Sequence, residues 1–269
     1  MLLWIKIIFN FLNMKPTKEW LKSWEKNRKF LINPCNLNEY FEKKEILWKK
    51  IDVLDLWTVS IPTWEIIVRD PLVYITRNEN PYFLKTPVWE FKVNACVVLG
   101  DKNDCDRYAV IKLDFNNNKS VRFEEALEGN EDFDNFQEGA FFWFWVDSWL
   151  WGILDKEALN PFCDFIDEFQ KNNIDKNLYD DYFSELFAKN YKENPKYQRD
   201  VWDWINWKIP GTKYNIPFFQ SGFGDWYYPV YFWFDKNNEI CSLIIQFINI
   251  ESDYNDEDDD DEEDDDDNL

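Results

Sequence analysis

The sequence predicts an α+β fold with a mostly antiparallel sheet, either sandwich-like or a partly open barrel, with N-terminal and mid-chain helices. Short apolar or alternating runs with turn residues between them fill residues 53–126 and 216–250, which is typical of strands and hairpins. Apolar side chains recur at helical spacing in residues 17–51 and 157–207. This segregation of strands and helices along the chain favours α+β.

The helices are expected in two regions. Between Thr17 and Ile51, apolar residues such as Trp20, Leu21 and Trp24 recur among lysines and glutamates, which predicts one or two amphipathic helices. In residues 157–207 the same spacing occurs in FCDFIDEFQ, YFSELFAKNY and VWDWINW. We therefore expect all three of these segments to be helical.

The strands are expected where turn residues interrupt apolar runs. The clearest prediction is a hairpin that joins YYPVYFWFD to EICSLIIQFINI through a turn at residues 236–238. FEEALEGNEDFDNFQEG is predicted to be a short helix or loop, followed by a strand at 140–147. The remaining predicted strands are IIV before Asp70 and Pro71, PVWEFKVNACVVLG, DRYAVIKLDF and IPFFQSGFGD.

Residues 17–250 are expected to form a single domain, flanked by two segments of different character. Residues 1–16 are an apolar leader, too short to span a bilayer, and translation starting at Met14 is as good an interpretation as one starting at Met1. Residues 251–269 contain fourteen acidic groups and no basic ones, so we expect a disordered tail. Without those fourteen charges the formal net charge of −22 becomes −8.

The composition excludes several classes of function. The chain has no histidine, which removes Ser-His-Asp and Cys-His mechanisms. Its five cysteines are scattered without a CxxC spacing, which favours reduced thiols in the cytoplasm and predicts no metal site. An acidic surface disfavours nucleic-acid binding. No cofactor-binding motif is present, so no cofactor is expected, and no membrane association is expected either.

Several segments together resemble a bacterial family known as domain of unknown function family 4241. They cover most of residues 53–250, and the last of them is the most specific. The N-terminal helices and the acidic tail lie outside the resemblance, which implies no activity. The segments are PTWEIIVRDPLVYI, FEEALEG, FFWFWVDSWLWGILD and SGFGDWYYPVYFWFDKNNEICSLIIQF.

The resemblance makes eight tryptophans unexpected, because the family has glycine at their positions. Glycine in such loops supplies a positive φ or lets backbones approach closely. UGA is read as tryptophan in one variant genetic code and as glycine in another, so we hypothesise that these positions are glycine in the cell. An aromatic core stripe and a carbohydrate-stacking face are the alternatives, and Trp20 and Trp24 are expected to be genuine. The eight are Trp64, Trp89, Trp143, Trp145, Trp149, Trp151, Trp226 and Trp233.

Two aspartates flanked by these predicted glycines, Asp147 and Asp225, are the candidate site residues. With Gly222, Gly224 and Tyr228 they could bind a ligand, and as a pair of carboxylates they could act as acid and base. An aspartate in such a turn more often accepts hydrogen bonds from nearby backbone N–H groups, which is the alternative interpretation. Further candidates are Asp70, Asp155 and Asp235. The residues that follow Asp70 and Asp235 are typical of turns, which favours a structural role for these two.

We expect a non-enzymatic binding protein whose acidic surface and tail bind a basic protein partner, as an immunity-type protein would. The alternatives are a carboxylate-based hydrolase and a carbohydrate- or small-molecule-binding domain, both using Asp147 and Asp225. For the tail alone, the favoured interpretation is that it keeps the protein soluble, and the alternative is that it binds a basic partner or masks a basic face of its own chain. The sequence predicts neither the ligand nor the oligomeric state.

Overall fold

A computed structural model describes residues 16–101, 104–134, 136–137, 139–200 and 202–255. The apolar leader and most of the acidic tail lie outside these residues. The predictions about the start codon, the disordered tail and the single domain therefore stay predictions.

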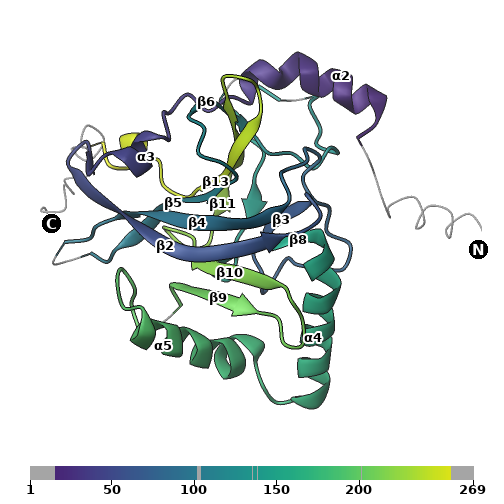
Figure 1. Ribbon diagram of the computed structural model, residues 1–269, viewed down its shortest axis with the longest axis vertical. Helices are drawn as coiled ribbons and strands as arrows, with labels where there is room; N and C mark the ends of the chain where they lie inside the picture. Colours follow the sequence, from purple (N-terminus) through teal and green to yellow (C-terminus); the bar gives the residue numbers. More distant parts are fainter. Residues whose placement is uncertain (1–15, 102–103, 135, 138, 201, 256–269) are drawn as a thin grey trace, which may run out of the picture.

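The largest element is a seven-stranded antiparallel sheet in the order β1-β2-β4-β5-β13-β12-β6. It curls into a half barrel around its apolar face (Figure 1). The α+β class and the antiparallel sheet are therefore confirmed, and the partly open barrel describes this sheet. Its strands are β1 (Glu45–Ile46), β2 (Lys49–Ile61), β4 (Trp89–Val98), β5 (Arg107–Asp114), β6 (Ser120–Glu125), β12 (Val230–Asp235) and β13 (Ile240–Gln246).

Two smaller antiparallel sheets pack beside the half barrel. The four-stranded sheet has the order β3-β8-β10-β9, and β2 of the large sheet contacts three of its strands. β7 and β11 form a separate two-stranded sheet. The strands are β3 (Ile66–Arg69), β8 (Leu150–Asp155), β9 (Trp204–Lys208) and β10 (Asn215–Gln220), with β7 (Phe144–Trp145) and β11 (Tyr227–Tyr228).

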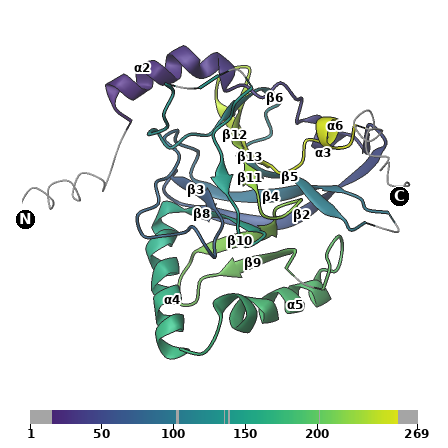
Figure 2. The same ribbon diagram turned by 180° about the vertical axis from the view of Figure 1, so that it is seen from behind.

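The helices lie on the outside of these sheets. In Figure 2, α4 and α5 run along the side of the four-stranded sheet, whereas α2 lies at the opposite end of the molecule, near β6. Thr17 caps α2 by accepting a hydrogen bond from the Trp20 N–H at 3.0 Å. The helices are α2 (Lys18–Asn27), α3 (Glu39–Glu42), α4 (Leu159–Asn172), α5 (Ser184–Glu193) and α6 (Ile250–Asp253), with short turns η1 (Arg28–Phe30), η2 (Lys156–Ala158) and the π-helical η3 (Tyr179–Phe183).

Buried side chains form three apolar clusters. The largest fills the half barrel and reaches the four-stranded sheet, and the second lies between that sheet and α4 and α5. The third lies under α2, where Trp20 packs with Leu31, Leu127 and Phe133. Trp20 is therefore a core residue, as its place on an amphipathic helix predicts. All five cysteines are free thiols.

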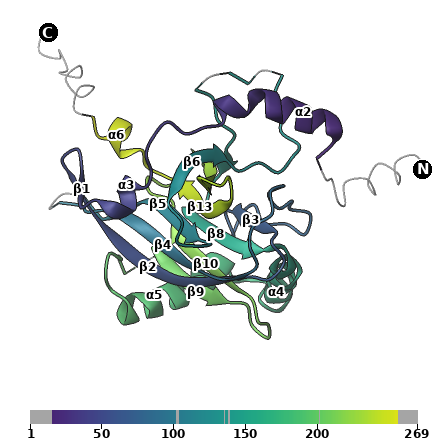
Figure 3. The same cartoon turned by 45° about the horizontal axis from the view of Figure 1, so that its top comes forward.

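The short helices α3 and α6 lie beside each other at one end of the molecule (Figure 3). The Tyr40 hydroxyl of α3 donates to the Glu251 carboxylate at 2.5 Å and accepts from the Ile250 N–H at 2.8 Å. Burial raises the pKa of Tyr40, and the Glu251 carboxylate adds to that shift. This buried hydroxyl therefore fixes the start of α6 against α3.

The predicted C-terminal hairpin is confirmed. β12 and β13 pair antiparallel, with a register shift after Trp233. Asp235 accepts the N–H of Asn237 at 2.8 Å and that of Glu239 at 3.0 Å, which closes the turn. Asn238 has a φ of 65°, and asparagine tolerates this region better than most residues.

Some element predictions were wrong. VWDWINW ends in strand β9, not in a helix, and Glu45–Ile51 contributes β1 and the start of β2. FEE, at the start of a predicted helix or loop, completes β6, and only Phe144–Trp145 of the strand predicted at 140–147 is extended in a sheet. Short apolar runs fit a buried strand as well as a helix, and pairing partners that are distant in sequence decided these cases.

Candidate functional site

A cavity of about 840 Å³ lies beside the C-terminal hairpin. Parts of four distant segments form its walls, namely residues 29–35, 139–141, 223–229 and 246–253. Glu125 and Tyr231, which are register partners on β6 and β12, also line it. Small-molecule sites typically measure roughly 300–1,000 Å³, so this cavity is the candidate functional site.

The N-terminal wall extends the large sheet. The Glu125 N–H donates to the Leu31 carbonyl at 2.9 Å, and the Asn33 N–H donates to the Phe123 carbonyl at 2.9 Å. Ile32 forms an isolated antiparallel bridge with Glu124 between these bonds. Residues 31–33 therefore cover the edge of β6, which fixes their side chains at the cavity.

Another wall comes from the loop that begins at Ser221, of which residues 223 and 226–229 line the cavity, whereas Gly222 and Gly224 do not. Gly222 and Gly224 have φ values of 64° and 105°, and a Cβ on Gly222 would lie 2.8 Å from the Phe247 Cβ, so this tight turn requires glycine. The hydroxyls of Ser221 and Tyr228 both donate to the Gly224 carbonyl, each at 2.8 Å. Tyr228 lines the cavity, while its hydroxyl holds the loop.

Glu125 is the most deeply buried polar residue of the cavity wall, with 3% of its surface exposed. Its Oε1 accepts the Phe142 N–H at 3.0 Å, while its Oε2 has no hydrogen-bond partner among the described residues. Burial raises the pKa of Glu125 well above its usual range, and the Glu131 carboxylate adds to this, against the opposing effect of the Phe142 hydrogen bond. Burial thus shifts the equilibrium of this carboxyl toward its protonated form.

A chain of amides and a thiol forms the other polar part of the wall. The Asn33 side-chain amide donates to Gln246 Oε1 at 2.7 Å, and the Cys35 N–H donates to Asn33 Oδ1 at 2.9 Å. Asn249 Nδ2 lies 3.5 Å from the Cys35 Sγ. Asn249 Oδ1 is buried without a partner within the described part of the chain. The cavity wall thus contains two unpaired oxygens, one on Asn249 and one on Glu125.

Substitution of Glu125 by glutamine is expected to stabilise the protein increasingly as the pH rises. The unfolded chain ionises this carboxyl near pH 4.5, whereas the folded chain keeps it protonated to higher pH. Burial of Glu125 therefore destabilises the fold progressively above pH 4.5, and glutamine removes that effect. Urea unfolding of both proteins at about pH 4, 6 and 8 measures it. A stability difference that is independent of pH would contradict the expectation.

Asp70, predicted as a turn residue, joins two loops. It is fully buried, and its Oδ1 accepts the N–H groups of Leu72 at 2.9 Å and Val73 at 3.1 Å, which caps its own turn. It also accepts the N–H groups of Asp147 and Ser148 and the Ser148 hydroxyl, at 2.7–3.0 Å. The second set of bonds positions the loop that carries Asp147.

Asp147 and Asp225 are both exposed. Asp147 accepts a hydrogen bond from the Tyr74 hydroxyl, and Asp225 accepts the Trp149 N–H at 3.0 Å. The structure thus brings their loops together, but neither aspartate lines the cavity, whereas Tyr228 does. Ligand binding or acid–base chemistry at Asp147 and Asp225 stays a prediction.

Asp155, the remaining aspartate candidate, holds a turn, as the alternative interpretation of such aspartates predicts. It accepts the N–H and the hydroxyl of Thr63 and the N–H of Glu157, with distances of 2.8–2.9 Å. Burial raises its pKa, and these hydrogen bonds oppose that shift. Because its oxygens are used by backbone and hydroxyl donors, Asp155 has a structural role.

Reasoning from the sequence missed the polar residues of the cavity, Glu125, Asn33 and Gln246. One signal for Glu125 exists in the pair Glu124–Glu125 at the end of β6, because neighbouring strand residues point to opposite faces. Glu124 forms ion pairs with Arg28 at 2.8 Å and Arg122 at 3.2 Å, so Glu125 occupies the other face. This signal is readable only once the segment is known to be a strand.

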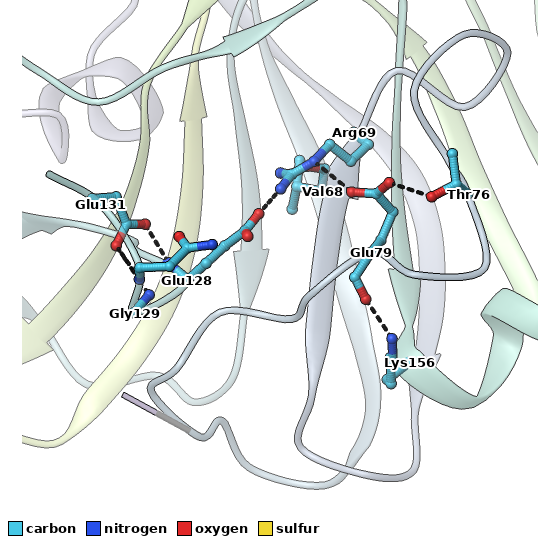
Figure 4. A network of polar contacts seen from close by, with 9 residues as sticks. Val68, Arg69, Thr76, Glu79, Glu128, Gly129, Glu131 and Lys156 are labelled. Carbon is cyan, nitrogen blue, oxygen red and sulfur yellow. Dashed lines mark hydrogen bonds and ion pairs between the residues drawn. The ribbon is translucent and has the colours of Figure 1, made fainter. Parts of the chain in front are cut away.

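A second buried charge cluster lies around Arg69, outside the cavity (Figure 4). Arg69 is 7% exposed and forms ion pairs with Glu79, at 3.4 Å, and with Glu128. Its guanidinium carbon lies 3.8 Å from the centre of the Phe144 ring. Lys156 donates to the Glu79 carbonyl in the same cluster. These contacts join β3 to two loops and to η2, which indicates a structural role.

Comparison with known protein families shows to which family the chain belongs. Residues 59–245, more than half of the chain, match the family model described as "Protein of unknown function (DUF4241)". The chain belongs to the DUF4241 family. The resemblance seen in the sequence is thereby confirmed. No curated protein and no solved structure matches it.

Two further properties of this DUF4241 protein concern the described residues alone. No helix among them is long and apolar enough for a bilayer crossing. Within the same residues, no group of three or more cysteine, aspartate or glutamate side chains has the arrangement of a metal site.

Four tryptophans of this DUF4241 protein have a left-handed backbone. Trp57, Trp64, Trp149 and Trp202 have φ values of 60–71°, and they are four of the seven non-glycine residues with positive φ in the described ranges. This region costs an L-residue about 1–2 kcal/mol, and glycine avoids that strain. Trp64 and Trp149 are among the eight positions where glycine is hypothesised, and the other two extend the pattern.

The remaining six of the eight positions divide into two groups. Trp89, Trp143, Trp145 and Trp226 are 44–74% exposed. Trp151 and Trp233 are buried in strands β8 and β12, and their indole N–H groups have no partner in the described part of the structure. A buried indole N–H usually has a hydrogen-bond acceptor. These two sites provide none among the described residues, although the indole rings pack in the core.

At Trp149 and Trp64, glycine variants are expected to be more stable than alanine variants by about 1 kcal/mol, because only alanine retains a Cβ at positive φ. Comparing glycine with alanine removes the effect of losing the indole. At Trp89, which does not have a positive φ, the order reverses by about 0.5–1 kcal/mol in favour of alanine. Urea unfolding of the six variants measures these differences, and the same order at all three sites would contradict the backbone argument.

Proposed function

We propose that this protein is a non-enzymatic binding protein whose cavity holds a small molecule with an apolar body. The observation that carries the proposal is the cavity of about 840 Å³, which is lined in part by residues 223–229. These residues belong to the segment that most specifically resembles the family. Its walls combine aromatic rings with a few polar groups, a composition typical of ligand sites. The lining rings include Phe30, Phe141, Phe223, Tyr227 and Tyr231.

Binding of the neutral fluorescent probe N-phenyl-1-naphthylamine tests this proposal. Ala140 lines the cavity and is exposed, so Ala140→Trp adds a bulky ring to the cavity wall with little effect on the fold. We expect the wild-type protein to bind the probe and Ala140→Trp to bind it about tenfold more weakly or worse. Lys176→Trp, between α4 and η3, is the matched control, because it adds the same ring at an exposed site that does not line the cavity.

Equal probe binding by the wild type and Ala140→Trp would place the probe elsewhere and contradict the proposal. Failure of the wild type to bind any of a set of neutral aromatic probes would do the same. Thermal unfolding of each variant confirms that it is folded under the conditions of the titration.

A second candidate function is recognition of a basic protein partner. In this case the protein would act as an immunity-type protein in the cytoplasm. It is supported by the net charge of −22, to which residues 251–269 contribute fourteen charges. Such charges accelerate association with a basic surface and make it sensitive to salt. We expect a protein ending at residue 255, which keeps α6, to lose salt-sensitive binding to a basic test protein such as lysozyme. Equal binding with and without residues 256–269 would exclude a role of these acidic residues.

We also propose that the gene is read with UGA as glycine. The support is the family's glycines together with the left-handed backbone at Trp64 and Trp149. Peptide mass spectrometry of the protein from its native host is expected to find glycine at the four positions between residues 143 and 151 where the sequence has tryptophan. Indole-containing peptides from this segment would end the proposal. Glu125, Asn33, Gln246 and Asn249 are the same residues in either case.

A further inference from the structure

We infer that the ligand of the cavity is an organic ammonium ion whose charged group binds at Glu125 and Asn249. This inference rests on the proposed function, because it names the chemistry of the molecule in the same cavity. It is carried by unpaired oxygens on two residues that line the cavity, and by the charged and aromatic residues that line it with them.

The first observation is the contrast between two neighbouring glutamates of β6. Glu124 forms ion pairs with Arg28 and Arg122 at 2.8 and 3.2 Å. Glu125 is as deeply buried, yet it forms no ion pair within the described residues, and its Oε2 has no hydrogen-bond partner there. Buried carboxyl groups are normally paired or hydrogen-bonded. The missing cation is therefore expected from outside the chain, through the cavity that Glu125 lines.

The second observation is the unpaired Oδ1 of Asn249, which lines the same cavity. The side-chain amide of Asn249 already contacts Cys35 through Nδ2, so the oxygen needs a donor. An ammonium group has three donors and no acceptor, which suits a cavity whose lining residues carry two unpaired acceptors. A carboxylate ligand has no hydrogen to give to Asn249 Oδ1.

The third observation concerns the surroundings of these two oxygens. Phe141 and Tyr227 line the cavity and give an apolar, electron-rich wall, which favours a cation that carries an aromatic body. Among the described residues, Lys29 is the only basic one that lines the cavity, and its ammonium lies over the Phe30 ring at 4.5 Å. Asp253 adds a negative charge at the cavity.

Ammonium binding should also release a proton. Burial favours the protonated carboxyl of Glu125 in the free protein, and an ion pair with the ligand requires the ionised form. The proton leaves Glu125 for the solvent, while the ligand keeps its own. Two titratable groups interact with Glu125, namely Glu131 in the following loop and Tyr231 on β12. The other titratable residues that line the cavity are Lys29, Cys35, Tyr227, Tyr228 and Asp253.

Three probes of similar size test the inference. They are 2-phenylethylamine, the neutral 2-phenylethanol and the anionic 3-phenylpropionate, titrated calorimetrically at neutral pH into the full chain. We expect the amine to bind about tenfold or more tightly than the alcohol, because a hydrogen bond between charged groups is worth more than one between neutral groups. Titration in two buffers of different ionisation enthalpy is expected to show proton release with the amine only.

Variants separate Glu125 from the rest of the cavity. Glu125→Gln is expected to weaken amine binding about tenfold or more and to abolish proton release, while binding of the alcohol is retained. Asn249→Asp adds a carboxylate and is expected to tighten amine binding, and it carries the test if Glu125→Gln does not fold. Glu185→Gln, on an exposed position of α5, is the matched control and leaves the three affinities unchanged.

The outcomes distinguish this inference from the proposed function. Equal affinity for the amine and the alcohol, or a preference for 3-phenylpropionate, overturns the ammonium inference and leaves a ligand-binding cavity in place. An amine preference that persists in Glu125→Gln overturns the role of Glu125. No binding of any of the three probes, together with no binding of the neutral fluorescent probe, overturns both proposals.

Discussion

Replacing Asp70 with alanine is expected to lower the free energy of unfolding by about 3–5 kcal/mol. One buried carboxylate accepts five hydrogen bonds, from the N–H groups of Leu72, Val73, Asp147 and Ser148 and from the Ser148 hydroxyl. Alanine leaves these donors without their acceptor, and each buried unsatisfied group costs about 1–3 kcal/mol, part of which water entering the site recovers.

Urea unfolding measures the effect, and Asp225→Ala is the matched control. Asp225 is exposed and accepts one N–H, that of Trp149. Its removal is expected to cost about 0.5–1 kcal/mol, because water replaces the lost acceptor. If the two variants were equally stable, Asp70 would not be the connection between the two loops.

Replacing Arg69 with methionine is expected to lower the free energy of unfolding by about 3–5 kcal/mol as well. The change keeps much of the apolar volume against Phe144 but leaves the carboxylates of Glu79 and Glu128 without their shared cation. Removing one partner of a buried ion pair leaves an uncompensated charge, which is the reason for the large effect. Chemical denaturation at neutral pH measures it.

Arg77→Met is the matched control for Arg69→Met. Arg77 also contacts two carboxylates, Asp164 at 2.7 Å and Asp167 at 2.5 Å, but its side chain is 43% exposed. Exposed pairs contribute about 0–1 kcal/mol, so this variant is expected to be nearly as stable as the wild type. Similar losses for both arginines would show that burial does not set the strength of the Arg69 cluster.

The strands that sequence patterns predicted best are those bounded by strong turn residues. Asp235 to Asn238 form a turn that fixes β12 and β13, and Gly100 follows the strand that was predicted from PVWEFKVNACVVLG. The failures lie where apolar spacing suits two structures. Trp204, Ile205 and Trp207 fit one face of a helix, yet all three are buried in β9, because β10 supplies the hydrogen bonds.

The candidate site could be predicted only in part. The glycines and Tyr228 belong to a local motif, so the tight loop at one wall was readable from the sequence. Glu125, Asn33 and Gln246 come from three distant segments, and they share a cavity because β6, β12 and β13 are neighbours in the sheet. That neighbourhood follows from strand order, which short-range patterns do not contain.

The edge of β6 is covered by a segment that lies outside the region matched by the family. The region matched by the family ends at residue 245, and it starts at residue 59, after the segment that covers this edge. Two of the four cavity walls, residues 29–35 and 246–253, thus belong to flanking sequence. If the cavity binds a ligand as proposed, a relative with different flanking segments would keep the scaffold and have a different ligand preference, so the fold and the ligand preference can evolve separately.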